Sequence, residues 1–328
     1  MLVIPAQRLR ELVPVRTAID AVRDGFIAGS SGDIEQPSRL VLEGGQALAM
    51  LAADRRGIGT VLKAVTVRRQ NAARGLPVVQ AVVVWFDGDT GTPEALIDGT
   101  TLTALRTGAA SGVATDLLAP PEAGVLAMIG AGGQAPDQVR AVCAVRPICE
   151  VRVASRNPAH AASLAARLAA ELEPVRVVAT SVAGAIAGAD VVCAATTATE
   201  PLFAARDLAP AVHVNAVGAY TEAMCELPAE LLAGASVIAV DRVEAAMAEA
   251  GDLIQAIRRG LLRPDRLVEI GALLARPTAP PGGRTVFKSV GVAAQDWALA
   301  RIAVERARAL EAGGRSGEQG DQLSGQPE

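Results

Sequence analysis

The feature that most constrains the fold is an apolar run that leads directly into closely spaced glycines. The run Val125–Ile129 is followed by GAGGQA, residues 130–135, and then by a helical pattern. This order of strand, glycine-rich turn and helix is typical of a dinucleotide-binding unit. Gly130 would allow the sharp turn, Gly132 would let the backbone approach a pyrophosphate, and Ala135 would let the helix pack closely on the strand. Free N–H groups at the helix start favour phosphate, so we predict a nucleotide site here.

The residues after the next predicted strand indicate which nucleotide is bound. An acidic residue at the end of Glu150–Ala154 would bind a ribose 2′-hydroxyl and repel a 2′-phosphate. The chain instead reads Ser155, Arg156 and Asn157. Because a guanidinium pairs with phosphate, we predict NADP(H) in preference to NAD(H). The alternative is that Arg156 is a solvated turn residue.

Composition excludes several classes of protein. The 328 residues are 51% hydrophobic and 20% charged, which suits a globular enzyme of two domains. The net charge of -4 and the aromatic content of 2% argue against nucleic-acid binding. The four cysteines and two histidines are scattered, so we expect no metal site and a reducing, cytoplasmic location. No signal peptide or membrane-spanning run is present, so no membrane partner is expected.

The hydrophobic pattern divides the chain into two parts. Before residue 118 it predicts an amphipathic helix, several strands with a hairpin, and a long apolar helix; these segments are Thr17–Ala28, Leu40–Leu42, Gln46–Ala52, Gly59–Val67, Val78–Phe86, Glu94–Ile97 and Leu102–Leu118. A Pro-Pro pair then marks a boundary. Beyond it, strands alternate with helices, at about 125–129, 150–154, 175–179, 190–195, 211–217, 236–240 and 284–288.

This alternation predicts an α/β fold with a Rossmann-type, doubly wound parallel sheet. We expect a mixed α/β substrate-binding and dimerisation domain over 1–118, joined by a C-terminal helix at 297–312. The nucleotide-binding domain would span 119–296. The segment 313–328 has almost no apolar residues and is expected to be a disordered tail.

Two cations stand in otherwise apolar segments of the first part. Lys63 alternates with Val61 and Val65 in a predicted strand, and Arg106 is the one charge in its stretch of helix. Each could belong to a structural ion pair. Together they suit a small anionic substrate such as a carboxylate, with Arg39 as a third cation. A lysine in an apolar wall can also have its pKa lowered enough to transfer protons.

Several segments together resemble the ornithine cyclodeaminase/mu-crystallin family. They are Arg74–Gln80 with Phe86–Asp87, Leu96–Thr107, Gly130–Gln134, His213–Gly218, Gly251–Leu253 and Val286–Gly291. The resemblance covers nearly the whole chain except the tail. It implies homodimers with an active site in the cleft between two domains, and hydride transfer between nicotinamide and the α-carbon of an amino or imino acid.

The resemblance also implies roles for particular residues. Arg39, Lys63 and Arg106 match the residues that hold the substrate carboxylate. We expect the cofactor to be bound by Gly130, Gly132, Gly133, Gln134, Ala135, Ser155, Arg156, Asn157, Thr196, Val217, Lys288 and Ser289. Thr196 or Thr197 would border the nicotinamide ribose. For Lys288 and Ser289, contact with the nicotinamide amide and loop packing are alternatives.

One departure from the family pattern bears on the reaction. Ornithine cyclodeaminase has an Asp, thought to bind the distal amine, where this chain has Tyr220. A phenol with a pKa near ~10 is not an anion at neutral pH, but it can donate a proton. Tyr220 is thus a candidate catalytic residue with Lys63, or a packing residue; Glu222 could replace the missing acid unless it points away. His213 is expected to be structural, and Asp296 to contribute to the start of the last helix.

These residues predict an NADP-preferring oxidoreductase that reduces a small cyclic imino acid of the pyrroline-2-carboxylate type. The alternatives are ornithine cyclodeaminase, an alanine-type dehydrogenase and a non-catalytic NADPH-dependent binding protein. The retained Lys63 and both arginines favour an enzyme.

Overall fold

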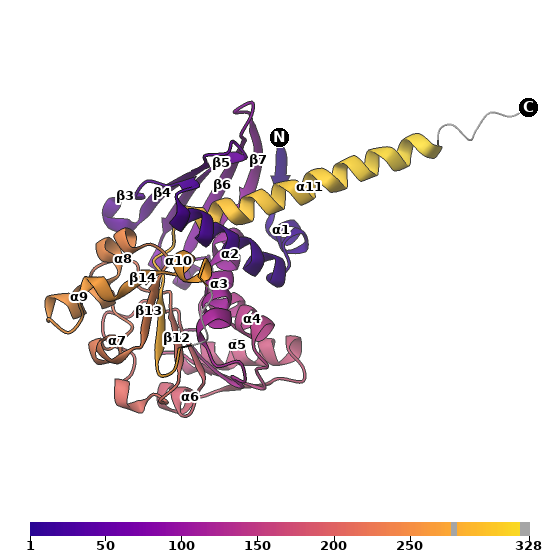
Figure 1. Ribbon diagram of the computed structural model, residues 1–328. Coiled ribbons are helices and arrows are strands. Elements are labelled where there is room, and N and C mark those ends of the chain that lie inside the picture. The colour runs from indigo at the N-terminus through magenta and orange to yellow at the C-terminus, as the bar shows by residue number, and fades with distance from the viewer. Residues whose placement is uncertain (277–280, 322–328) are drawn as a thin grey trace, which may run out of the picture.

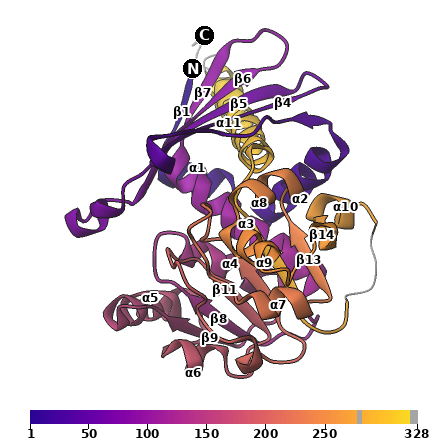
Figure 2. The same ribbon diagram turned by 90° about the vertical axis from the view of Figure 1, so that its left-hand side faces the viewer.

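The computed structural model describes residues 1–276 and 281–321, apart from the side chains of residues 43, 72 and 313–321. Two sheets lie on either side of a central helix (Figures 1 and 2). The strands are β1 (Leu2–Ile4), β2 (Ile34–Glu35), β3 (Leu40–Leu42), β4 (Ala47–Asp54), β5 (Gly59–Val67), β6 (Val79–Asp87), β7 (Pro93–Asp98), β8 (Val125–Ile129), β9 (Glu150–Ala154), β10 (Arg176–Ala179), β11 (Val191–Ala194), β12 (His213–Ala216), β13 (Val237–Val240), β14 (Leu267–Glu269) and β15 (Thr285–Lys288). The helices are α1 (Ala6–Leu12), α2 (Val15–Ser31), α3 (Gly99–Leu118), α4 (Ala135–Val145), α5 (Pro158–Glu171), α6 (Val182–Ile186), α7 (Ala229–Gly234), α8 (Val243–Glu249), α9 (Gly251–Arg258), α10 (Ile270–Leu274) and α11 (Ala293–Asp321).

The first sheet, which we call sheet A, is mixed. Its strand order is β1-β7-β6-β5-β4-β2, with β3 paired to β4; only the β1–β7 pair is parallel. Side chains of β5 alternate between the two faces, so Val61, Lys63 and Val65 are all buried on the inner face. The prediction that Lys63 shares a face with apolar neighbours is therefore confirmed.

The second sheet, sheet B, contains eight parallel strands in the order β10-β9-β8-β11-β12-β15-β13-β14. Its two faces pack into different cores. Leu126 and Met128 of β8 lie in the core with α4 and α5, whereas Ala127 and Ile129 lie in the core of the opposite face. Helices on both faces of a parallel sheet confirm the predicted doubly wound α/β architecture. Strand β14 was not anticipated, because three residues carry too little periodicity to be recognised.

Helix α3 lies between the two sheets, with contacts to strands of both. Its apolar and small residues are spread around its whole circumference, which agrees with the burial of nearly all of its residues. Small residues let α4 approach closely: a Cβ at Gly108 would lie 2.4 Å from the Asp137 carbonyl oxygen. This close packing on α4 therefore holds α3 and its side chains in place between the two sheets.

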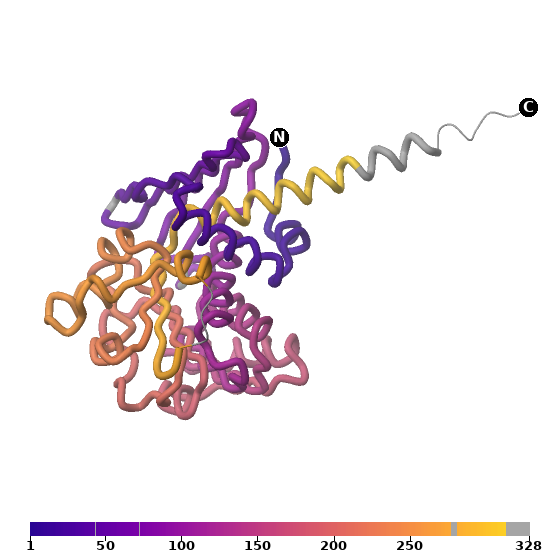
Figure 3. Tube along the Cα trace, in the orientation of Figure 1, coloured from indigo at the N-terminus to yellow at the C-terminus, as the bar shows by residue number. Residues whose placement is uncertain are grey.

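The last helix, α11, returns the chain from sheet B to sheet A (Figure 3). Trp297 packs there against Trp85, with ring centroids 6.0 Å apart. The helix continues to Asp321, past residue 312, so it includes the start of the segment expected to be a disordered tail; residues 322–328 lie outside the described part. Adding residues to a helix that is already formed costs little free energy. The prediction of a disordered tail from composition alone did not take this into account. No helix within the described ranges is long and apolar enough to cross a membrane.

Candidate functional site

A cavity of about 250 Å³ lies where sheet A faces the carboxyl ends of the strands of sheet B. Its walls come from both sheets and from α3. Among the predicted site residues, those that line it are Arg39, Lys63, Arg106, Gly132, Gly133, Gln134, Thr196, Val217, Tyr220 and Ser289. Those that do not are Gly130, Ala135, Ser155, Arg156, Asn157 and Lys288. Residues from seven separate stretches of sequence are thus brought to one cavity.

The glycine-rich loop joins β8 to α4 at one end of this cavity. Gly130 has a φ of 109°, and a Cβ there would lie 2.4 Å from the carbonyl oxygen of Ala195. Gly132 and Gly133 face open space, and Ala135 is fully buried at the start of α4. The side-chain oxygen of Gln134 is buried without a hydrogen-bond partner. An open, glycine-lined approach to a helix start fits a dinucleotide.

The residues after β9 lie beside this loop, because Ala154 pairs with Ile129 and accepts a hydrogen bond of 2.8 Å from the Gly130 N–H. Asn157 caps α5 by accepting a hydrogen bond of 3.0 Å from the Ala159 N–H. Arg156 is exposed and has no ion pair with another described side chain. It is therefore available to an anion placed next to the glycine loop.

The cation predicted in β5 is part of a buried ionic cluster. Lys63 Nζ lies 2.7 Å from Asp296 Oδ1, and Arg106 Nε lies 3.4 Å from the same oxygen. Arg106 Nη1 also donates a hydrogen bond of 2.5 Å to Gln295 Oε1. Gly291 packs against the guanidinium, where a Cβ would lie 2.5 Å from Nη1. The expected role of Asp296 at a helix start was incomplete: it lies in the first turn of α11, but its carboxylate faces both cations.

The electrostatics of this cluster leave net positive charge at the cavity. Two cations share one carboxylate, whose second oxygen is buried without a partner. Burial lowers the pKa of Lys63 to about 8, although the Asp296 carboxylate acts in the opposite direction. An ammonium with such a pKa can both attract an anion and release a proton near neutral pH.

Arg39 is already largely occupied by contacts across the cavity. Its Nε donates 2.8 Å to Glu249 Oε1, and Nη2 pairs with the second oxygen of that carboxylate. Nη2 and Nη1 also donate to the carbonyl oxygens of Tyr220 (3.3 Å) and Val290 (3.1 Å). Since a guanidinium has five N–H donors, these four bonds leave one. Arg39 can therefore offer a ligand less than Arg106 can.

Tyr220 lines the cavity, and its ring centroid lies 6.0 Å from the Arg39 guanidinium carbon. Glu222 does not replace the missing acid: it is exposed, pairs with Arg258 and is absent from the cavity wall. The cavity wall thus has the Tyr220 phenol, and not Glu222, where the family pattern has its Asp.

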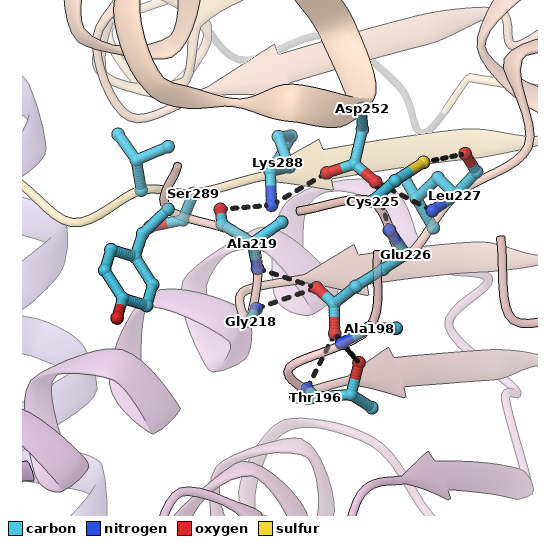
Figure 4. Close-up of polar contacts among 12 residues, drawn as sticks. Thr196, Ala198, Gly218, Ala219, Cys225, Glu226, Leu227, Asp252, Lys288 and Ser289 are labelled. Atoms are coloured by element: carbon cyan, nitrogen blue, oxygen red, sulfur yellow. Dashed lines mark hydrogen bonds and ion pairs between the residues drawn. The ribbon is translucent and has the colours of Figure 1, made fainter. Parts of the chain in front are cut away.

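The loops that follow β11, β12 and β15 are held by a second buried cluster (Figure 4). Glu226 accepts hydrogen bonds from Thr196, Gly218 and Ala219, and Lys288 Nζ lies 3.1 Å from Asp252. Lys288 also donates 2.8 Å to the Ala219 carbonyl oxygen and is fully buried. The structure therefore turns Lys288 away from the cavity. This favours loop packing over the alternative of contact with the nicotinamide amide, and Asp252 supplies the partner that a buried lysine requires.

Two further predicted residues have defined environments. Ser289 lines the cavity but donates 2.8 Å to Asp241 Oδ2, which also accepts from the N–H groups of Val290 and Gly291. His213 is buried between Thr285 and Asn215, and burial lowers its pKa to about 4. A neutral, hydrogen-bonded histidine agrees with the structural role expected of it.

The sequence analysis did not assign Glu226, Asp252 or Glu249, and it gave only a partial role to Asp296. Each of the first three is an acid in a largely apolar stretch. The same signal that selected Lys63 and Arg106 would have selected them.

Known proteins share both the sequence and the fold. The ornithine cyclodeaminase/mu-crystallin family model matches residues 2–311. A Delta(1)-pyrroline-2-carboxylate reductase from Bacillus cereus is 36% identical over 320 residues, which cover 94% of this chain and 97% of that protein.

Two solved structures match over 95% of this chain. The Thermococcus litoralis Delta(1)-pyrroline-2-carboxylate reductase, in complex with NADH and L-proline, has a TM-score of 0.90 at 32% identity, with 98% of its chain covered. An archaeal alanine dehydrogenase dimer with bound NAD has a TM-score of 0.87 at 28% identity, with 97% covered. The chain is therefore an enzyme of the ornithine cyclodeaminase/mu-crystallin family, as the sequence motifs predicted.

Proposed function

We propose that the protein is an NADP(H)-preferring reductase of a small cyclic imino acid, of the pyrroline-2-carboxylate type. The observation that carries this proposal is the cluster of Lys63, Arg106 and Asp296 in the same cavity as the glycine loop. It would hold a substrate carboxylate beside the reactive end of a dinucleotide. The names of the reductases from Bacillus cereus and Thermococcus litoralis support the choice of substrate.

The cofactor would lie along the carboxyl ends of β8, β9, β11 and β12. The glycine loop would hold its pyrophosphate, and Thr196, Val217 and Ser289 would border its nicotinamide half. A reduced nicotinamide supplies a hydride. The preference for NADPH rests on Ser155 and on Arg156 beside the loop, which forms no ion pair with another described side chain, since a guanidinium binds a 2′-phosphate. The two solved structures described above hold NADH and NAD, so a preference for NADPH would distinguish this chain from them.

The substrate would be anchored mainly by Arg106 and Lys63. Arg106 keeps N–H donors on Nη1 and Nη2 beyond its bond to Gln295, and the remaining donor of Arg39 adds a third contact. In the reaction the C=N carbon gains a hydride and the nitrogen gains a proton. Lys63, whose pKa burial lowers to about 8, is the proton donor that we favour over the Tyr220 hydroxyl.

The cyclodeaminase alternative is disfavoured by the residues around Tyr220. Cyclisation of ornithine requires a group that binds and deprotonates the distal amine. Tyr220 supplies a phenol and not a carboxylate, and Glu222 is paired with Arg258 outside the cavity. We therefore expect no formation of proline and ammonia from ornithine.

We further propose that the protein is a homodimer that forms through the outer face of sheet A. This face exposes apolar side chains on adjacent strands, namely Leu40, Leu42, Leu51, Leu62 and Val82. We propose that a second copy of this chain covers the face, since an alanine dehydrogenase of the same fold is a dimer. Analytical ultracentrifugation would show twice the chain mass, and a monomer at micromolar concentration would refute this.

The four cysteines, Cys143, Cys149, Cys193 and Cys225, are all free thiols in the structure. Unpaired thiols persist in a reducing compartment. We therefore propose a cytoplasmic enzyme.

Oxidation of NADPH or NADH is the experiment that tests the reaction. Delta(1)-pyrroline-2-carboxylate should be reduced, whereas pyruvate with ammonia should be a poor substrate and ornithine with NAD(P)+ should give no proline. Arg156→Ala should raise the Kd of NADPH about tenfold and leave that of NADH unchanged. Proline formation from ornithine would refute the proposed reaction, and equal Kd values for the two cofactors in the parent protein would refute the preference.

A further inference from the structure

One buried carboxylate joins two loops of the cavity wall. Glu226 Oε1 accepts hydrogen bonds from the Thr196 N–H (2.7 Å) and the Thr196 hydroxyl (2.9 Å), at the end of β11. Glu226 Oε2 accepts from the N–H groups of Gly218 (2.8 Å) and Ala219 (3.1 Å), after β12. Figure 4 shows the carboxylate between the two loops. Four donors on one fully buried side chain make a strong, directional link.

The loops meet so closely here that residue 218 has no room for a side chain. A Cβ on Gly218 would lie 2.3 Å from the Thr196 carbonyl oxygen and 2.4 Å from Glu226 Oε1. Thr196, Val217 and Gly218 all line the cavity. A small displacement of the carboxylate would therefore move the wall itself.

A second layer holds Glu226 in turn. Asp252 Oδ1 accepts hydrogen bonds from the N–H groups of Glu226 (2.5 Å) and Leu227 (2.8 Å), and Asp252 Oδ2 lies 3.1 Å from Lys288 Nζ. Lys288 donates to the Ala219 carbonyl oxygen, which closes the network onto the same loop. All three charged side chains are buried and none lines the cavity.

We propose that Glu226 is a positioning residue: it holds the part of the cavity wall that would contact the nicotinamide half of the cofactor. It does not affect the binding of the adenosine half. The adenosine half would lie by the residues after β9, and among the described residues the Glu226 carboxylate bonds only to Thr196, Gly218 and Ala219. This inference rests on the proposed function only in requiring a nicotinamide dinucleotide. It requires no particular substrate.

Glu226→Gln provides the sharpest test, because the amide has the same shape but one acceptor oxygen. If that oxygen remains at Gly218 and Ala219, the NH2 group faces the Thr196 N–H, and two donors oppose each other. The binding of NADPH should be compared with that of 2′-phospho-ADP-ribose, which lacks the nicotinamide. Calorimetry without any imino acid measures both.

Asp190→Asn is the matched control. Asp190 Oδ2 accepts 2.9 Å hydrogen bonds from the N–H groups of Gly124 and Val125. These bonds lie at the amino-terminal ends of the strands of sheet B, opposite the carboxyl ends that face the cavity. The same acid-to-amide change there perturbs a similar link far from the cavity. It should leave the Kd of both probes unchanged.

In Glu226→Gln the Kd of NADPH should rise about tenfold, while that of 2′-phospho-ADP-ribose should change less than about twofold. Equal weakening of both probes, or of neither, would overturn the assignment, as would a parent protein that binds no NADPH. If Glu226→Gln does not fold, Asp252→Asn should also weaken NADPH binding more than 2′-phospho-ADP-ribose binding, by a smaller factor. Equal effects on the two probes in that variant would overturn the assignment. A parent protein that binds NADPH but reduces no imine would refute only the proposed reaction.

Discussion

Lys63 and Asp296 form an ion pair of 2.7 Å although 233 residues separate them in the chain. Lys63 comes from β5 and Asp296 from the first turn of α11, and both side chains are almost fully buried. The pair places an ammonium on the wall of the cavity and keeps it protonated despite its burial. Its carboxylate also lies beside Arg106.

The ion pair predicts how activity depends on pH. Because burial lowers the pKa of Lys63 to about 8, the ammonium is lost as the pH rises through 8. The value of kcat/KM for imine reduction should therefore fall above about pH 8. In Asp296→Asn the anion that favours the charged lysine is absent, so the alkaline limb should move down by about one to three units. A pH profile of both proteins checks this, and an unshifted limb would assign the limb to another group.

Arg106→Lys should lower kcat/KM by at least about tenfold. A lysine retains the charge, but all its donors lie on one nitrogen, so it cannot reach Gln295 and also bind a carboxylate through two nitrogens as a planar guanidinium does. Arg56→Lys is the control, since Arg56 pairs with Asp54 on the surface and lies away from the cavity. Steady-state kinetics measure both variants, and normal kinetics in Arg106→Lys would make Arg106 a structural residue.

Tyr220→Phe distinguishes the two candidate proton donors. If Lys63 supplies the proton, as its lowered pKa favours, the variant should keep kcat within about threefold of the parent. The cation–π contact with Arg39 does not need the hydroxyl. A loss of tenfold or more at saturating substrate would instead identify the Tyr220 hydroxyl as the donor.

His213 predicts a loss of stability in acid. Its pKa is lowered by burial to about 4 in the folded protein and is near ~6.5 when unfolded, so the unfolded state binds more protons between these values. The free energy of unfolding should thus fall as the pH drops from about 6.5 to 4, by at most about 3 kcal/mol from this residue. His213→Gln, which keeps hydrogen-bonding groups but does not titrate, should show a shallower slope in urea denaturation at several pH values. Identical slopes would show that other groups cause the acid instability.

Sequence patterns that span a few neighbouring residues determined those parts of the site that consecutive residues form. The glycine loop was predicted correctly, because strand, turn and helix follow one another in the chain and only glycine adopts the φ of Gly130 without strain. The burial of Lys63 followed from the two-residue period of β5, and that of Arg106 from the apolar helix around it. The doubly wound sheet followed from the alternation of strands and helices.

Only the tertiary structure decided which groups meet. The partners of Lys63, Arg39 and Lys288 are Asp296, Glu249 and Asp252, and the first two pairs join segments more than 200 residues apart. A sequence shows that a charge stands in an apolar stretch and must be paired, but the partner depends on how the two sheets pack on α3. The same packing turned Lys288 away from the cavity and left Arg39 with a single free donor. Periodicity acts over a few residues, whereas ion pairs form wherever folding brings charges together. The sequence therefore identified Lys63 and Arg106 as charges in apolar surroundings, and only the fold assigned their partners.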